Sequence, residues 1–117
     1  MKKRPIIIKS NFVPTLFSLF MSVIAVTLWP FIFVKKEYVN DVVLINHETI
    51  HFYQYRELWI VGMYIIYMYD WFHGLIKYRD PTKAYFRIRF EQEAHRWQEN
   101  LLYPECRRPF AWREYKV

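Results

Sequence analysis

An uncharged stretch of 23 residues, 12–34, constrains the fold of this 117-residue chain more than any other feature. The stretch follows a basic N-terminus and precedes Lys35 and Lys36, and it is long and apolar enough for a membrane-spanning helix. A basic start before an apolar run is also typical of a signal peptide, with Val23-Ile24-Ala25 as a weak cleavage pattern, but we expect no cleavage.

A pair of short β-strands is the competing prediction for the same stretch. Most residues between positions 23 and 27 are β-branched, and residues 31–34 read Phe-Ile-Phe-Val, as is typical of strands. Pro30 lies between the two segments, where it would interrupt a spanning helix but suits a bend or an edge strand. We therefore expect a β-hairpin near residues 22–35, and an all-α fold with an N-terminal transmembrane helix is the alternative.

Two helices are predicted in the middle of the chain. The first begins near residue 42, with Asn40 or Asp41 as its N-cap. The second uncharged run, residues 58–69, is too short to cross a membrane comfortably. It predicts a helix that is buried or lies in a membrane interface and that continues to about residue 78.

A third helix is predicted after the turn at Asp80-Pro81-Thr82, over residues 82–102. Residues 103–117 form a basic, aromatic tail that we expect to pack irregularly. Without an internal repeat or a low-complexity segment, residues 1–117 are expected to form one domain, of which residues 1–11 are a basic N-terminal segment.

Composition excludes several classes of function. The chain has only two glycines, so it cannot build a glycine-rich phosphate loop. Cys106 is the single cysteine, which excludes an internal disulfide and a thiolate zinc site. The net charge of +6 would attract anionic lipid or nucleic acid, but the basic residues are dispersed and form no known nucleic-acid-reading motif.

Residues 47–51 read His-Glu-Thr-Ile-His, an H-E-x-x-H motif on the first predicted helix. Histidines at i and i+4 lie on one helix face, so both imidazoles can reach one zinc ion at about 2.0–2.1 Å. Glu48 is offset from them around the helix, where it can take a proton from a metal-bound water whose pKa zinc lowers to about 7. We therefore predict His47 and His51 as metal ligands, Glu48 as the catalytic base and Zn²⁺ as the cofactor.

The last predicted helix supplies a candidate for the third protein ligand that catalytic zinc sites usually have. On a helical wheel of this helix, with successive residues about 100° apart, the apolar residues form one arc and Glu91 falls inside it. A buried carboxylate without a cation is costly in free energy. Arg87 also leans toward this arc and is the alternative partner of Glu91. Glu93 falls at the edge of the polar arc and is expected to be solvated. The buried arc is predicted to comprise Phe86, Phe90, Ala94, Trp97 and Leu101, extended by Ala84, Ile88 and Leu102.

Five further residues are candidates for a supporting role around the metal. His95, four residues after Glu91, would orient a ligand or be an alternative ligand itself. Gln54 shares the helix face of the histidines and is a candidate to hold one of them. Tyr85 and Tyr55 are candidates for oxyanion stabilisation, and His73 would either line the site or be a structural histidine near a helix end.

The pairing of H-E-x-x-H with a downstream E-x-x-A, Glu91 to Ala94, resembles the gluzincin arrangement. Locally the pattern is similar to that of the CAAX-type membrane endopeptidases, although His95 stands where an acidic residue usually follows. Residues 27–34, 44–54, 84–85 and 90–94 also resemble a group of short bacterial zincin-like proteins. The resemblance implies a zincin-like helical core with His47, His51 and Glu91 as ligands and Glu48 as base. It also favours strands near residues 22–35, because gluzincins hold substrate backbone at a strand edge.

Two functions from different classes fit these residues. The first is a minimal zinc-dependent metallopeptidase that hydrolyses peptide bonds. The second is a non-catalytic zincin-like protein that has a structural or assembly role in a larger particle or membrane complex. Glu48 favours the first, because a purely structural zinc site has no use for a general base.

Partners and location follow from the same features. We expect a peptide or protein substrate, together with a membrane surface, a homo-oligomer or a larger assembly that completes the substrate cleft. Nucleic acid is not expected as a partner. The predicted location is membrane-associated or cytoplasmic, without disulfides.

Overall fold

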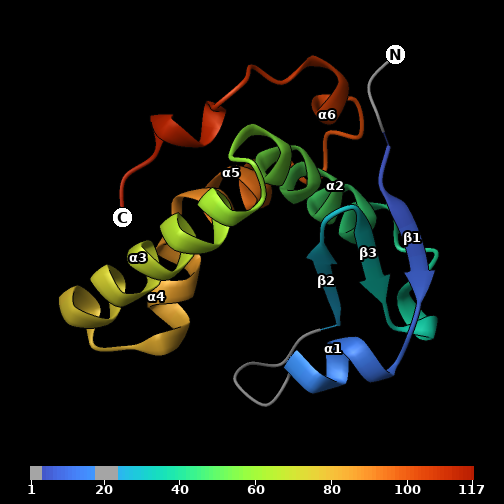
Figure 1. The fold of residues 1–117 in the computed structure, drawn as a ribbon, viewed down its shortest axis with the longest axis horizontal. Coiled ribbons are helices and arrows are strands. Elements are labelled where there is room, and N and C mark those ends of the chain that lie inside the picture. The colour runs from blue at the N-terminus through green and yellow to red at the C-terminus, as the bar shows by residue number, and fades with distance from the viewer. Residues whose placement is uncertain (1–3, 18–23) are drawn as a thin grey trace.

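In the part of the chain that the structure describes, six α-helices accompany a small three-stranded mixed sheet (Figure 1). The computed structural model describes residues 4–17 and 24–117. In chain order the elements are β1 (Ile6–Lys9), α1 (Phe12–Phe17), β2 (Ala25–Leu28), β3 (Phe31–Val34), the 3₁₀ helix η1 (Lys36–Tyr38), α2 (Val42–Glu57), α3 (Val61–Tyr78), α4 (Pro81–Arg87), α5 (Arg89–Trp97), α6 (Tyr103–Cys106) and the 3₁₀ helix η2 (Ala111–Glu114). This architecture confirms the predicted α+β fold with mainly helical content and an N-terminal strand pair.

The predicted hairpin is formed by β2 and β3, which pair antiparallel across a turn at Trp29 and Pro30. β1 pairs in parallel with β3, so the strand order is β1-β3-β2 and β2 lies at an edge of the sheet. The sequence prediction missed β1 and assigned it to the basic N-terminal segment. Most side chains of this strand are exposed, so it lacks the alternation of apolar and polar residues that identifies a half-buried strand.

Residues 12–34 do not form one spanning helix, because residues 25–34 are the hairpin and Pro30 lies in its turn. Residues 12–17 form the short helix α1, which the strand-pair prediction did not include. Residues 18–23, which contain the start of the predicted hairpin and of the weak cleavage pattern, lie outside the described residues. Among the described helices, none combines the length and the hydropathy needed to cross a bilayer.

Helix α2 begins after the N-cap Asp41, whose carboxylate accepts a hydrogen bond from the backbone N–H of Leu44 at 3.1 Å. The sheet covers one side of this helix and α5 packs on another, so the middle of α2 is almost wholly buried (Figure 1). The indole of Trp29 stacks on Phe52 of α2 with ring centroids 6.0 Å apart. The helix that carries H-E-x-x-H is therefore the central element of the fold.

The single helix predicted over residues 82–102 is wrong, because the chain forms α4 and α5 with a break at Ile88. Asp80 caps α4 as predicted, through the backbone N–H of Thr82 at 3.0 Å. Asp70 of α3 lies fully buried beneath the break, where it accepts hydrogen bonds from the backbone N–H and the guanidinium of Arg89. A carboxylate from another helix therefore caps α5, and local sequence carries no sign of it.

Helix α5 also ends earlier than predicted, at Trp97. The side-chain amide of Asn46 on α2 donates to the backbone carbonyls of Gln98 and Asn100, at 2.7 and 2.9 Å, and so stabilises the turn after the helix. Leu101 and Leu102 consequently lie outside the helix and are exposed, and so is Phe86 on α4. The rest of the predicted arc is buried or partly buried: Ala84, Ile88, Phe90, Ala94 and Trp97.

The C-terminal segment folds back across α5 rather than packing without regular structure, and it contains α6 and η2. Trp112 of η2 packs edge-on against Phe90 of α5, with ring centroids 4.8 Å apart. Tyr103 of α6 stacks on Trp97 at the same centroid distance, 4.8 Å. These contacts place the last residues of the fold against the helix that carries Glu91.

Candidate metal centre

The two histidines of the H-E-x-x-H motif face each other across one turn of α2. The Nε2 atoms of His47 and His51 lie 3.2 Å apart, and both side chains are buried. Their spacing on the helix brings the two imidazoles together, and the packing of α2 in the centre of the fold buries them. The buried group formed by His47, Glu48 and His51 can hold a metal ion.

Glu91 enters the same space from α5. One of its carboxylate oxygens lies 3.1 Å from Nε2 of His47, and the other lies 3.1 Å from Nε2 of His51. Ligand atoms at about 2.0–2.1 Å from a tetrahedral zinc ion lie about 3.3 Å from one another. Each imidazole therefore lies at about the spacing of two metal ligands from one oxygen of Glu91. Arg87, the alternative partner, donates from its guanidinium to the backbone carbonyl of Lys116.

Each imidazole forms a hydrogen bond through Nδ1, on the side of the ring away from the cluster. This bond leaves Nε2 facing the cluster as an acceptor. Nδ1 of His51 lies 2.7 Å from Oε1 of Gln54, and Nδ1 of His47 lies 2.9 Å from Oε1 of Gln98. The Gln54 amide is oriented by its own NH₂ group, which donates to the carbonyl of Phe90 and to Glu93. Since an amide oxygen only accepts, Nδ1 carries the proton and a neutral ring presents a lone pair at Nε2.

The cluster therefore brings two imidazole lone pairs and one carboxylate together out of water, an arrangement that requires a cation. In the protein alone a proton supplies this positive charge. Burial lowers the pKa of His51, but the charge and hydrogen bond of Glu91 raise it to about 9. Burial raises the pKa of Glu91, yet His51 and His47 hold it well below its usual range.

Glu48 points away from the line of the two histidines, toward the sheet. Its Oε2 lies 3.0 Å from the hydroxyl of Thr27 on β2, and that hydroxyl is also 3.0 Å from the backbone carbonyl of Glu48. Thr27 is buried, so the carboxylate is held in one position beside the cluster rather than being free to reorient. The sequence prediction did not identify Thr27, because its link to Glu48 depends on how the hairpin packs on α2.

Two tyrosines surround Glu91. The hydroxyl of Tyr85 on α4 donates to Oε1 at 3.1 Å, and the hydroxyl of Tyr67 on α3 donates to Oε2 at 2.9 Å. Burial, followed by the charge of Glu91, raises the pKa of both phenols, so they remain protonated donors. Tyr85 was a candidate from the sequence and lies at the site. Tyr67 was missed, although it shares one face of α3 with the buried residues Asp70 and Gly74.

His95 lies at the more open side of the cluster. Its Nδ1 is 2.8 Å from the backbone carbonyl of Glu91, and its ring centroid is 4.6 Å from that of His47. About a third of the side chain is exposed, 34%, whereas His47 and His51 are buried. Burial and the neighbouring His47 lower the pKa of His95, which favours its neutral form. His47, Glu91 and His95 form a second group with metal-ligand spacing.

Two other candidates from the sequence lie outside the cluster. His73 is exposed on α3, with its ring 6.1 Å from that of Tyr69. Tyr55 is part of the apolar core and packs against Tyr64 with centroids 5.3 Å apart. Neither side chain contacts Glu91 or the two histidines in the part of the chain described, so the structure does not place them at the site.

The prediction that Glu93 is solvated is wrong, because its side chain is fully buried. One oxygen accepts from the hydroxyl of Tyr103 at 2.7 Å and from Nε of Arg107 at 2.8 Å, and the other accepts from Gln54 at 2.9 Å. Arg107 also pairs with Glu57 at the end of α2. The helical arc could not predict the burial of Glu93, because its cationic partner Arg107 belongs to the C-terminal segment, which covers the polar side of α5.

Comparison with protein-family models, with curated proteins and with solved structures gives no match to this chain. The resemblance to zincins therefore stays a prediction.

Proposed function

We propose that this chain is a zinc-dependent metallopeptidase in which His47, His51 and Glu91 bind the metal and Glu48 is the general base. One observation carries the proposal. The two Nε2 atoms of α2 lie 3.2 Å apart, and each lies 3.1 Å from one of the two carboxylate oxygens of Glu91 on α5, in a buried space where amide oxygens orient both histidines for binding through Nε2. These ligand types, a pair of histidines and a carboxylate, are those of hydrolytic zinc sites with one position left for water.

Each residue around the metal would have a separate role in hydrolysis. Bound zinc would supply a water of lowered pKa and polarise the scissile carbonyl. Glu48, held by Thr27, would accept a proton at its carboxylate from the attacking water and deliver it to the leaving amine. Tyr85, whose single hydroxyl proton is donated to Glu91 in the structure, would turn it to the oxygen that becomes negative once Glu91 holds the metal. His95, which is partly exposed, would line the entrance for substrate.

The substrate class that this arrangement supports is an extended peptide. β2 lies at the edge of the sheet, and its residue Thr27 contacts Glu48. A peptide added along an edge strand is held by main-chain hydrogen bonds that do not depend on its sequence. Such binding would bring a peptide bond close to the base.

The metal content of the purified protein tests the ligand set. We expect about one zinc ion per wild-type chain, and a loss of at least about tenfold in zinc affinity for His47→Ala and for Glu91→Gln. His73→Ala is the matched control, because it removes a histidine outside the cluster. Equal zinc content in all four proteins would contradict the site.

A second measurement separates catalysis from metal binding. Glu48→Gln keeps the shape and a hydrogen-bond acceptor for Thr27, so we expect it to retain zinc and to lose cleavage of a mixed peptide library by about a hundredfold or more. Glu99→Gln, at an exposed carboxylate in the turn after α5, serves as the control. Cleavage that is unchanged in Glu48→Gln would rule out its role as base.

The structural alternative is favoured by one observation, the proximity of His95 to His47 and Glu91. If His95 occupied the fourth position of the metal, the site would be closed as in structural zinc sites. His95→Ala separates the two functions. A loss of zinc affinity as large as that of His47→Ala would support the structural role, whereas retained zinc with reduced cleavage would support the peptidase.

A further inference from the structure

The side of α3 that faces away from the core is apolar along its whole length. We call this surface the outer face of α3; it comprises Val61, Ile65, Met68, Phe72 and Ile76. These five residues recur every three or four positions, so they form one stripe on the helix. Each exposes between 46% and 80% of its surface, and at about 1.5 Å per residue the stripe is roughly 25 Å long.

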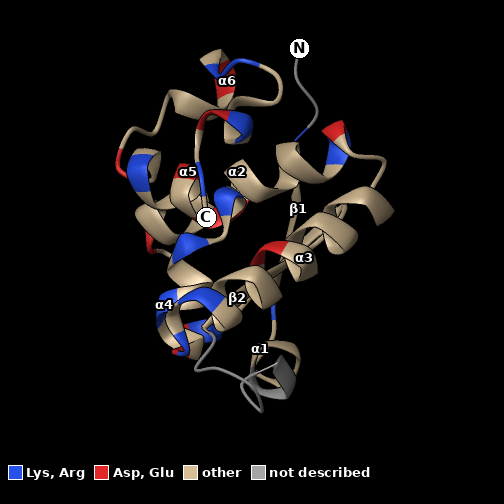
Figure 2. Cartoon of the chain, turned by 90° about the vertical axis from the view of Figure 1, so that its left-hand side faces the viewer, with Lys and Arg blue, Asp and Glu red and all other residues tan. Residues whose placement is uncertain are grey.

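The fold does not need this stripe for its own core. α3 already packs against the rest of the protein through its opposite face, on which Met63, Asp70 and Gly74 are buried. Asp70 is the one acidic residue of α3, and its ion pair with Arg89 keeps it inside. Figure 2 shows most of α3 tan with one red segment, and the charged residues of this helix are Asp70, which is buried, and Lys77 in its last turn. A surface helix with an uncharged outer face marks a membrane or protein contact.

An exposed tryptophan stands at the N-terminal end of the stripe. Trp59 is 89% exposed, and both Trp59 and Ile60 have positive φ angles, 54° and 67°. This backbone conformation is unfavourable for a β-branched residue such as Ile60 and is often kept where function requires it. The turn between α2 and α3 therefore exposes the indole of Trp59 to solvent, and its unfavourable backbone conformation lowers the stability of the fold.

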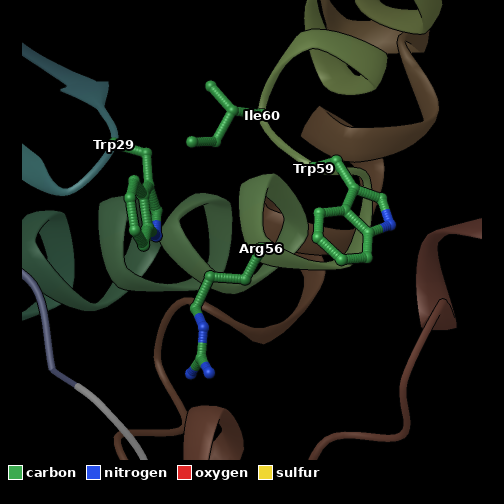
Figure 3. Close-up of a pocket in the computed structure, with 4 residues that line it drawn as sticks. All are labelled: Trp29, Arg56, Trp59 and Ile60. Carbon is green, nitrogen blue, oxygen red and sulfur yellow. The ribbon is translucent and has the colours of Figure 1, made fainter.

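Basic side chains flank the outer face at both of its ends. Arg56, which is exposed, lies beside Trp59 and Trp29 around a cavity of about 260 Å³ (Figure 3). At the other end Arg79 is exposed, and so is Lys77, whose ammonium donates to the backbone carbonyl of Val117 at 3.2 Å. Trp and Tyr at the ends of an apolar helix face, with Lys and Arg around it, are typical of helices that lie in the interface of a bilayer.

We propose that the outer face of α3 binds the surface of an anionic phospholipid bilayer, with Trp59 inserted at the headgroup level and Arg56 contacting lipid phosphate. A second copy of the chain fits less well. Cations stand at both ends of the stripe, so parallel or antiparallel pairing of two copies would bring like charges together, whereas lipid phosphates attract both ends. The proposal does not depend on the metal site.

Flotation with vesicles tests the proposal on the full chain. We expect the wild type to float with vesicles of equal parts phosphatidylcholine and phosphatidylglycerol, and binding to fall when salt is raised or when phosphatidylglycerol is left out. The double variant Ile65→Ser, Phe72→Ser should bind roughly tenfold or more weakly, because two apolar side chains no longer enter the bilayer.

The matched control is Leu101→Ser, Leu102→Ser, which removes two exposed apolar residues elsewhere and should bind as the wild type does. Arg56→Gln should weaken binding to the mixed vesicles and reduce the effect of salt, while Trp59→Phe should lose part of the lipid-induced blue shift in fluorescence. His47→Ala should bind normally, which separates this surface from the proposed peptidase.

Three outcomes would overturn the proposal. One is a wild type that stays unbound with mixed vesicles. Another is a loss of binding in the leucine control as large as that in the α3 variant. The third is light scattering that shows a dimer dissociated by Ile65→Ser, Phe72→Ser, because the stripe would then be a protein interface.

Discussion

Each imidazole in the cluster depends on an amide oxygen behind it. Gln54 holds His51 from within the same helix, whereas Gln98 holds His47 from the turn after α5. These amides carry no charge and do not reach the metal position. They nevertheless decide which ring nitrogen is free to bind, and such partners commonly change metal affinity by about 10–100-fold.

Gln98→Ala should therefore weaken zinc binding by about tenfold or more, because His47 then loses the acceptor that keeps the proton on Nδ1. Gln98 is only partly buried, so we expect the variant to fold with a melting temperature close to that of the wild type. Competition against a fluorescent zinc chelator gives the affinity. The matched control is Gln92→Ala, which removes an amide that donates to the carbonyls of Arg87 and Lys116. Equal effects of the two changes would show that Gln98 has no special role.

At this scale the sequence predicts the residues that share one helix with the motif, but only some of those that meet it from other elements, namely Glu91, Tyr85 and His95. His47, Glu48, His51 and Gln54 follow from spacing on α2 alone. Tyr67, Gln98 and Thr27 reach the cluster from α3, from the turn after α5 and from β2, and nothing in their local sequence distinguishes them. The same limit made Glu93 look solvated, because its cation lies fourteen residues further on.

Helices α3 and α4 are in close contact at Gly74. A Cβ atom at this position would lie 3.0 Å from the Cα and Cβ atoms of Ala84, which is itself fully buried. Only glycine permits this approach without a shift of the backbone of α4. The position of Tyr85, which follows Ala84 directly and donates to Glu91, depends on it.

Gly74→Ala should lower the free energy of unfolding by about 1 kcal/mol. Overpacking costs about 1–3 kcal/mol, and the better helix propensity of alanine returns about 1 kcal/mol. Urea unfolding followed by circular dichroism measures the change. Gly62→Ala on the same helix is the control, because its added methyl meets only the side chain of Leu58, and it should be neutral or stabilising. A Gly74→Ala protein as stable as the Gly62→Ala protein would show that α4 can move aside.

The elements were predicted where their signals are local. The cap at Asp41 and the turn at Asp80 each lie next to the helix that they start, and both were identified. The break at Ile88 was not, because its stabilising carboxylate, Asp70, belongs to α3. The 100° arc nevertheless placed Glu91 inside, because Glu91, Phe90 and Ala94 all lie on the uninterrupted part of α5.

Over the whole molecule, the coupled charges of the cluster make the stability of the metal-free protein depend on pH. The pKa of His51 is about 9 in the folded protein and 6.5 in an unfolded chain. The folded state thus keeps a proton that the unfolded state has lost, so the free energy of unfolding should fall from pH 6.5 toward pH 9. Glu91, with its pKa lowered below 4.5, adds stability that is lost as the pH falls below that value.

Melting temperatures measured in the presence of a chelator at several pH values check this prediction. His51→Gln should flatten the decline between pH 6.5 and 9, because it removes the group that titrates there. His73→Gln, at an exposed histidine, should retain the decline. A wild-type melting temperature that is constant across this range would show that His51 is not protonated in the folded protein.

The contact between Arg107 and Glu93 has a consequence for how the protein matures. Glu93 holds the amide that orients His51, and its countercharge lies on a segment that follows every other part of the cluster in the chain. During synthesis, a nascent polypeptide without residue 107 would carry both histidines and Glu91 while the carboxylate beside them lacked its cation. Correct metal loading should therefore come after translation of this segment, so that an ion is captured by a finished protein rather than by a growing one.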